Sequence, residues 1–288
     1  MHRRTMIGAL IALTLTPVLA PDSMAWAADG EAQTLSYGPD PLQRLDFRPG
    51  RGAKAPLVLF VHGGGWRFGS KDNATGPDKA AHYGEQGYAF ASINYRLVPD
   101  ATVEQQAQDV ADALALLRRE AGRLGVDPDR IALMGHSAGA HLVALVGTDM
   151  RYFRAAGLGP RAVRGIVPLD GAAYDVASQL AQAGPFMRRT YMQAFGTDPG
   201  RQRALSPTLQ AAAPNAPSFL ILHVDRDDGK AQSQALAAAL RRAGTPVEIH
   251  ALEGRGLSGH VEINRRMGDP AYAGTGLVDA YLKRIFAQ

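Results

Sequence analysis

The sequence of 288 residues contains no cysteine. This absence excludes a thiol nucleophile, a cysteine-ligated zinc site and any disulfide. Charged residues make up only 20% of the chain, against 46% hydrophobic residues, so the charge excess of a disordered protein is also missing. This composition predicts one globular domain that its hydrophobic core alone must stabilise.

A strong imbalance of charge is absent as well. The formal net charge is only +4, and the lysines and arginines are interleaved with acidic residues rather than gathered into a block. The sequence therefore argues against a nucleic-acid partner.

The chain also lacks a hydrophobic run long enough for a membrane-spanning helix. The apolar stretch from Met6 to Ala20 has about 15 residues, too few to cross a hydrocarbon core of about 30 Å, and Pro17 interrupts it. An uncleaved membrane anchor is the less favoured reading of this stretch.

The N-terminus instead has the three parts of a secretory signal peptide. Basic residues precede the apolar stretch, and Ala25-Trp26-Ala27 follows it as a small-x-small cleavage site. We therefore expect a signal peptide over residues 1–27, and a secreted or periplasmic mature protein with no stable membrane anchor. The pair Arg3-Arg4 leaves the choice between general secretion and a twin-arginine route open.

Short, continuous apolar runs recur along residues 28–288, as expected for strands that are buried on both faces. Helical patterns separate them, which predicts an α/β fold with a mostly parallel central sheet and helices on both faces. The expected strands are 56–61, 88–93, 131–134, 165–169, 219–224 and 247–252, and the clearest helical patterns are 103–124 and 232–243.

The longest stretch without a regular pattern runs from Ala173 to Pro217, where five prolines interrupt it. Long insertions in compact domains often serve as lids or binding loops, so we expect a lid-like insertion ahead of the 219–224 strand. Two readings of its large side chains stay open: they line a substrate pocket, or they pack the insertion onto the sheet. These side chains are Tyr174, Phe186, Tyr191, Met192 and Phe195.

Gly135-His136-Ser137-Ala138-Gly139 follows one of the expected strands and precedes an apolar helical stretch. This is the setting of the G-x-S-x-G nucleophile elbow, whose glycines let the backbone turn sharply around a strained serine. A serine hydroxyl is a poor nucleophile unless a base lies beside it. The pattern makes Ser137 the candidate nucleophile, with His136 shaping the turn.

A second glycine-rich motif, His62-Gly63-Gly64-Gly65-Trp66, directly follows the 56–61 strand. Glycines leave backbone N–H groups unshielded, so such a loop is suited to binding an oxyanion. We expect the N–H groups of Gly64 and Gly65 to form the oxyanion hole together with that of Ala138, the residue after the serine.

The base must be a histidine near the C-terminal end of the chain, and two are available. His250 lies within an alternating strand pattern, which favours a structural role. His260 lies beyond it in a glycine-rich segment interpreted as a flexible loop, and is the preferred base.

The third member of a triad would be a carboxylate in the loop after the 219–224 strand. That loop reads Asp225-Arg226-Asp227-Asp228-Gly229. We prefer Asp228, because Gly229 lets the chain turn it inward, and Asp225 and Asp227 remain alternatives. The loop superficially resembles a calcium-binding loop, but Leu236 occupies the position of the closing glutamate, so no metal site is expected.

The order Ser137, Asp228, His260 is that of α/β-hydrolases. The chain resembles the esterase and lipase branch of that fold family with an HGGGW loop, close to its hormone-sensitive-lipase-like and arylformamidase-like groups. The matching segments are 62–71 (HGGGWRFGSK), 92–99 (SINYRLVP), 135–139 (GHSAG) and 259–264 (GHVEIN).

The resemblance implies an α/β-hydrolase domain over 28–288 and an acyl-enzyme formed on Ser137 without any cofactor. It also implies that His62 shapes the oxyanion loop and that Tyr95 supports the sheet edge near the site. We expect a carboxylesterase acting on small to medium ester substrates. The alternatives are an arylformamidase-type amidase that uses the same groups and, remotely, a non-catalytic binding protein on this fold.

Overall fold

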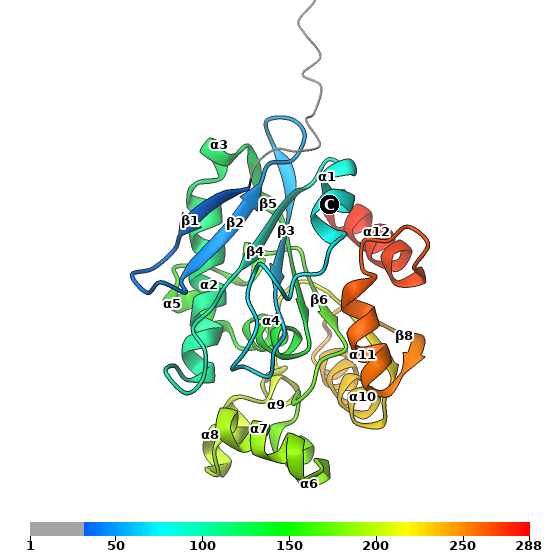
Figure 1. Cartoon of the computed structure of the whole chain (residues 1–288). Helices are drawn as coiled ribbons and strands as arrows, with labels where there is room; N and C mark the ends of the chain where they lie inside the picture. The colour runs from blue at the N-terminus through cyan, green and yellow to red at the C-terminus, as the bar shows by residue number, and fades with distance from the viewer. Residues whose placement is uncertain (1–31) are drawn as a thin grey trace, which may run out of the picture.

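The structure, a computed structural model, describes residues 32–288. The expected signal peptide at residues 1–27 lies outside these residues. In the described part, eight strands form one sheet in the order β1-β2-β4-β3-β5-β6-β7-β8 (Figure 1). They are β1 (Gln33–Ser36), β2 (Arg44–Arg48), β3 (Ala55–Val61), β4 (Ala89–Ile93), β5 (Val126–His136), β6 (Gly165–Leu169), β7 (Phe219–Asp225) and β8 (Val247–Arg255).

The sheet is mostly parallel, as predicted. β3 to β8 pair in parallel, whereas β1 pairs with β2, and β2 with β4, in the antiparallel sense. The two antiparallel strands, β1 and β2, lie between residues 33 and 48, where no strand was predicted. The other six strands were all predicted, with boundaries that differ by up to five residues.

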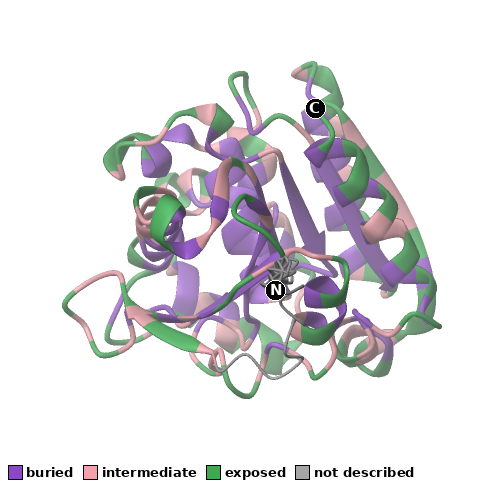
Figure 2. Cartoon of the chain, turned by 90° about the horizontal axis from the view of Figure 1, so that it is seen from above, coloured by how far each residue is buried: buried purple, intermediate pink, exposed green. Residues whose placement is uncertain are grey.

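Helices cover both faces of the sheet, so the strands lie between two apolar layers. Side chains of β3 alternate between them: Leu57 and Leu59 belong to one core cluster, and Val58 and Phe60 to the other. Burial is concentrated along the strands in the middle of the molecule (Figure 2). The helices are α1 (Lys79–Glu85), α2 (Val103–Arg119), α3 (Ala121–Leu124), α4 (Ala138–Thr148), α5 (Met150–Ala155), α6 (Val176–Gln182), α7 (Pro185–Phe195), α8 (Pro199–Ala204), α9 (Pro207–Gln210), α10 (Asp227–Arg242), α11 (Gly256–Arg265) and α12 (Ala273–Phe286).

The insertion between β6 and β7 is helical, which the sequence interpretation missed. Three of its prolines, Pro185, Pro199 and Pro207, begin helices α7, α8 and α9 instead of interrupting them. Proline suits the first helical position because its fixed φ is already helical and the missing N–H has no intrahelical partner there. The insertion lies beyond the carboxyl ends of the strands, at the bottom of Figure 1.

Among residues 32–288, no helix combines the length and the apolar character that crossing a bilayer requires.

Candidate active site

The turn that joins β5 to α4 holds Ser137 in a strained backbone conformation. Its φ and ψ are 55° and −117°, a backbone conformation that residues other than glycine rarely adopt. The two flanking glycines make the turn possible. A Cβ at Gly135 would lie 2.4 Å from the carbonyl oxygen of Gly139, and one at Gly139 would lie 2.1 Å from that of Val61. These contacts give the predicted elbow a steric explanation.

His260 lies beside this serine, 123 residues further along the chain. Its Nε2 is 3.0 Å from the Oγ of Ser137, and its Nδ1 is 2.6 Å from the Oδ2 of Asp170. The predicted pair of Ser137 and His260 is therefore brought together. His260 lies on helix α11, however, and not in the flexible loop that the sequence suggested.

The carboxylate opposite His260 is that of Asp170, so the preference for Asp228 was wrong. Asp170 directly follows β6, with a φ of 42°, and its side chain has no exposed surface. Since β6 precedes the insertion, the insertion follows the strand that carries this acid. A signal was present in the sequence: a strand buried on both faces ends at Leu169, and a carboxylate comes next.

The three predicted carboxylates are turned away from His260 because helix α10 begins at once after β7. Asp228 accepts hydrogen bonds from Arg226 and Gln179. Asp225 is exposed and pairs with Arg255, with 3.4 Å between Oδ2 and Nε, and Asp227 is an exposed residue of the first turn of α10.

Asp170 is held ionised within the protein. Its Oδ1 accepts a hydrogen bond from the amide of Val224, and its Oδ2 also accepts one from the Nε of Arg226. Burial by itself raises the pKa of the Asp170 carboxyl, but the hydrogen bond from His260 and the charge of Arg226 outweigh it, and the pKa lies below its usual value. An ionised Asp170 accepts a hydrogen bond from the Nδ1–H of His260, which leaves the Nε2 lone pair directed at Ser137.

The glycine loop lies against the nucleophile. A Cβ at Gly63 would come within 3.0 Å of the Cβ of Ser137. Gly64 and Gly65 have positive φ angles of 124° and 61°, and a Cβ at Gly64 would lie 2.0 Å from the carbonyl oxygen of Phe68. Both glycines line a cavity of about 280 Å³ that Ser137 and His260 also line.

The third predicted oxyanion donor, Ala138, is the first residue of α4. Amides in the first turn of a helix have no intrahelical acceptor, and the helix dipole gives them a partial positive charge. The position of Ala138 next to Ser137 therefore agrees with the role expected for its amide.

The base of the glycine loop is fixed by His62 and Tyr95. The Tyr95 hydroxyl donates to the carbonyl of His62 over 3.0 Å, and the two rings stack with centroids 4.3 Å apart. Burial lowers the pKa of His62 to about 4, so the ring is neutral and its Nδ1–H donates to the carbonyl of Gly63. These contacts match the shaping role expected for His62.

A second buried imidazole connects the serine turn to the helix of the base. Burial lowers the pKa of His136 to about 3, and its Nε2–H donates to the carbonyl of His260 over 2.8 Å. His136 is thus neutral and fixes the middle of α11, at His260, relative to the elbow.

Trp66, which follows the glycines, contacts the insertion. Its ring packs edge-on against Tyr191 and Phe195, with the Phe195 centroid 4.8 Å away, and its Nε1 donates to Nδ1 of His141. His141 in turn donates from Nε2 to the carbonyl of Leu205. The glycine loop and the insertion are therefore packed together.

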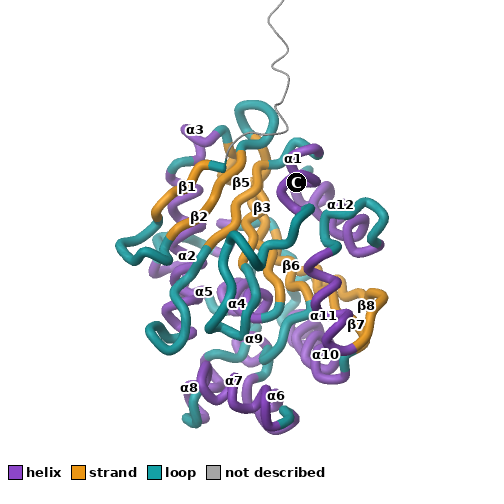
Figure 3. Tube along the Cα trace, in the orientation of Figure 1, coloured by secondary structure: helices purple, strands orange, loops and turns teal. Residues whose placement is uncertain are grey.

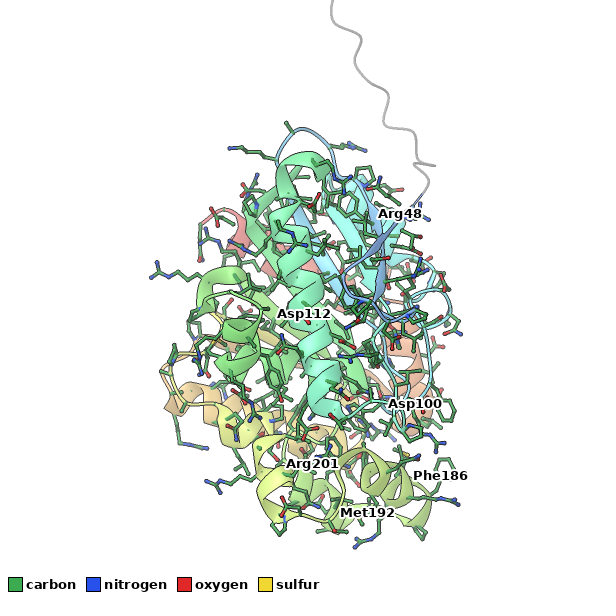
Figure 4. The ribbon with its side chains drawn as sticks, turned by 90° about the vertical axis from the view of Figure 1, so that its left-hand side faces the viewer. Arg48, Asp100, Asp112, Phe186, Met192 and Arg201 are labelled. Carbon is green, nitrogen blue, oxygen red and sulfur yellow. The ribbon has the colours of Figure 1, made fainter. Side chains whose placement is uncertain are left out.

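Three of the five large side chains of the insertion pack into the core, as one of the two interpretations predicted. Tyr174, Tyr191 and Phe195 are buried in the core. Phe186 is 84% exposed at the edge of the insertion (Figure 4). None of the five, Met192 included, is among the residues that line the cavity at Ser137.

Comparison with known proteins establishes the family of the chain. Residues 45–240 match the model of the BD-FAE family. The chain belongs to the BD-FAE family.

Over 241 residues this BD-FAE protein is 34% identical to esterase LipQ of Mycobacterium tuberculosis, an alignment that covers 76% of the chain and 55% of LipQ. It is 34% identical over 203 residues to esterase LipC of the same organism, covering 66% of the chain and 50% of LipC. The chain thus spans about half the length of these curated relatives.

The BD-FAE protein also resembles solved structures in fold. Esterase B from Lactobacillus rhamnosis superposes with a TM-score of 0.72 at 23% identity, covering 89% of this chain and 85% of that one. At this identity the likeness shows the fold, which is that of the α/β-hydrolases. The tube in Figure 3 shows the helices around the central strands.

Proposed function

We propose that this BD-FAE protein is a serine carboxylesterase that cleaves esters through an acyl-enzyme on Ser137. The observation that carries the proposal is the continuous contact from the Oγ of Ser137, through both nitrogens of His260, to the buried carboxylate of Asp170. This arrangement has the parts of a catalytic triad. The names of LipQ and LipC, both esterases, support the reaction type.

In the first half of the reaction, Nε2 of His260 takes the proton of the Ser137 hydroxyl while Oγ attacks the ester carbonyl carbon. The carbonyl oxygen becomes an oxyanion, which the amides of Gly64, Gly65 and Ala138 stabilise. Asp170 stays ionised and stabilises the imidazolium. When the tetrahedral intermediate collapses, the C–O bond to the alcohol breaks and His260 gives its proton to the leaving alkoxide.

In the second half, His260 takes a proton from water, and the hydroxide attacks the acyl-enzyme carbonyl. A second oxyanion forms at the same amides. Its collapse breaks the bond to Oγ, returns the proton to Ser137 and releases the carboxylic acid. Each cycle consumes one ester and one water and requires no cofactor.

Kinetics with p-nitrophenyl acetate, butyrate and octanoate test this proposal. We expect turnover by the wild type that favours the shorter acyl chains, since the cavity at Ser137 holds only about 280 Å³. Ser137→Ala should reduce kcat/KM by about 10⁵-fold or more. Ser178→Ala, on the surface helix α6, is the control for loss of a hydroxyl. A wild type no faster than Ser137→Ala would favour the non-catalytic reading, and faster hydrolysis of N-formylaniline than of any ester would favour the amidase.

We also propose that the protein is exported through the N-terminal signal. The basic start, the short apolar stretch and the Ala25-Trp26-Ala27 site support this proposal. Expression of the full chain in a bacterium, followed by fractionation and N-terminal sequencing, should give a periplasmic or secreted protein that begins near Ala28. A membrane fraction that retains residue 1 would contradict it.

A further inference from the structure

Arg226 lies beside the proposed triad without contacting Ser137. It is the residue immediately before α10, with an extended backbone, so its side chain leaves the chain before the helix begins. The guanidinium reaches back to the end of β6, where Nε is 3.2 Å from the Oδ2 of Asp170 and Nη2 is 3.1 Å from the carbonyl oxygen of Gly171. It therefore contacts both the acid's carboxylate and the backbone turn that carries it.

Arg226 and His260 bind the same oxygen. The Oδ2 of Asp170 lies 2.6 Å from Nδ1 of His260 and 3.2 Å from Nε of Arg226, while Oδ1 accepts only from the amide of Val224 among the described residues. Since the Asp170 side chain is fully buried, water screens this competition poorly. The guanidinium of Arg226 therefore holds the Asp170 carboxylate in place. Its positive charge also reduces the stabilisation that Asp170 gives to a protonated His260.

A second carboxylate partly neutralises that cation. Both oxygens of Asp228 accept from Nη1 of Arg226, at 2.9 and 2.8 Å, and Gln179 donates to Oδ2 of Asp228. The space around the guanidinium is limited, because a Cβ at Gly229 would lie 2.7 Å from Nη2. The charges therefore alternate along a chain of contacts that runs from His260 through Asp170 and Arg226 to Asp228.

Building on the proposed function, we propose that Arg226 is a positioning residue for Asp170, and that Arg226 and Asp228 together set the pH at which His260 becomes competent as a base. Arg226 opposes protonation of His260, and Asp228 weakens that opposition. Removing one or the other should then shift the acid side of the pH–rate profile in opposite directions. A purely structural role would lower the rate without such a pair of shifts.

The other groups that face His260 stay the same in this comparison. The elbow contributes the neutral ring of His136, with its centroid 4.6 Å away. From α1 comes Lys79, whose Nζ binds the backbone carbonyl and the side chain of Asn264 on α11. On α11 itself, Glu262 pairs with Arg265.

The test is the pH dependence of kcat/KM for p-nitrophenyl acetate in three variants. Arg226→Met should move the acid-side midpoint up by about 0.5 to 1 pH unit, because the competing cation is lost. Asp228→Asn should move it down by about 0.3 to 0.5 unit, because Arg226 is no longer neutralised. Arg226→Lys, which keeps the charge but not the planar fork, should retain the midpoint within about 0.2 unit and lose about 3- to 10-fold in kcat.

Midpoints that do not move, or that move in the same direction in Arg226→Met and Asp228→Asn, would overturn the proposal. Thermal melts establish that each variant is folded, and if Arg226→Met does not fold, the downward shift in Asp228→Asn decides alone. If the wild type hydrolyses no ester, the proposed function fails, but the electrostatic claim is still tested. NMR titration of the His260 ring, identified by its absence in His260→Gln, should show the same opposite shifts.

Discussion

The carboxyl ends of β5 and β6 differ sharply from those of β7 and β8, although all four lie side by side in one sheet. The first pair is followed by, or ends in, two buried residues with hydrogen-bond partners: His136 donates to the carbonyl of His260, and Asp170 accepts from the amide of Val224 and from His260. The second pair ends in Asp225 and Arg255, whose side chains are 58% and 89% exposed. A carboxylate orients an imidazole strongly only where water does not compete for it. The carboxylate that contacts His260 therefore comes from the buried strand end at β6, and not from the exposed one at β7.

The largest effect on activity is expected when the buried carboxylate of Asp170 is neutralised. Asp170→Asn should lower kcat/KM by about 10³- to 10⁴-fold, because the amide no longer stabilises the imidazolium and allows the wrong ring tautomer. Asp227→Asn, at the exposed start of α10, is the matched control and should stay within twofold of the wild type. Equal losses in both variants, measured by initial rates, would remove the distinction between the two strand ends.

A second effect concerns stability in acid. Burial lowers the pKa of His136 to about 3, whereas the unfolded chain binds this proton below about pH 6.5. Below pH 6.5 the unfolded state therefore binds more protons than the folded state, and stability is lost as the pH falls toward 3. His62 and His141, both with a pKa lowered to about 4 by burial, act in the same direction.

Urea unfolding at pH 4.5 to 6 measures this dependence. His136→Gln should reduce the slope of unfolding free energy against pH by about 1.4 kcal/mol per unit, the value for one proton. His250→Gln, at a β8 side chain that is 39% exposed, is the control for loss of an imidazole. An equal change of slope in both variants would contradict the prediction.

A smaller effect is expected from crowding the guanidinium next to Asp170. Gly229→Ala places a methyl group 2.7 Å from Nη2 of Arg226 and 3.1 Å from Oδ1 of Asp170, so one of them must move. We expect kcat/KM to fall by about 10-fold, which in free energy is about a quarter to a third of the effect of Asp170→Asn and is measured by steady-state kinetics. Gly276→Ala in α12, where a methyl group meets nothing within 4 Å, should leave the rate unchanged.

The smallest effect should come from a substitution at the exposed ends of β7 and β8. The exposed pair of Asp225 and Arg255 is screened by water, so Asp225→Asn should change the unfolding free energy by less than about 0.5 kcal/mol. Thermal melts at low and high salt measure this. A loss above about 2 kcal/mol would show that exposure does not separate the two regions.

The local motifs could be predicted from the sequence because backbone geometry dictates them. The turn at Ser137 requires glycine on both sides, and the loop after β3 requires it at Gly64, so both positions are visible in the residue letters. The partner of His260 could not be predicted in this way. It depends on which of several carboxylates folds inward, and the start of α10 at Asp227 turns the three clustered ones away.

The insertion was misinterpreted for a related reason. Proline was treated as an interruption, although it is favoured at the first position of a helix and occupies that position in three of the four helices there. The side chains proposed to line a pocket could not be placed from the sequence, because burial of Tyr191 and Phe195 depends on their contact with Trp66 from a distant segment.

That contact restricts how the insertion can move relative to the glycine loop. Because the indole of Trp66 packs among Tyr191, Phe195 and His141, swinging the insertion outward would pull on the turn that carries the amides of Gly64 and Gly65. The insertion and the glycine loop therefore form one packed unit, and the insertion cannot swing away without moving the loop that lines the cavity at Ser137.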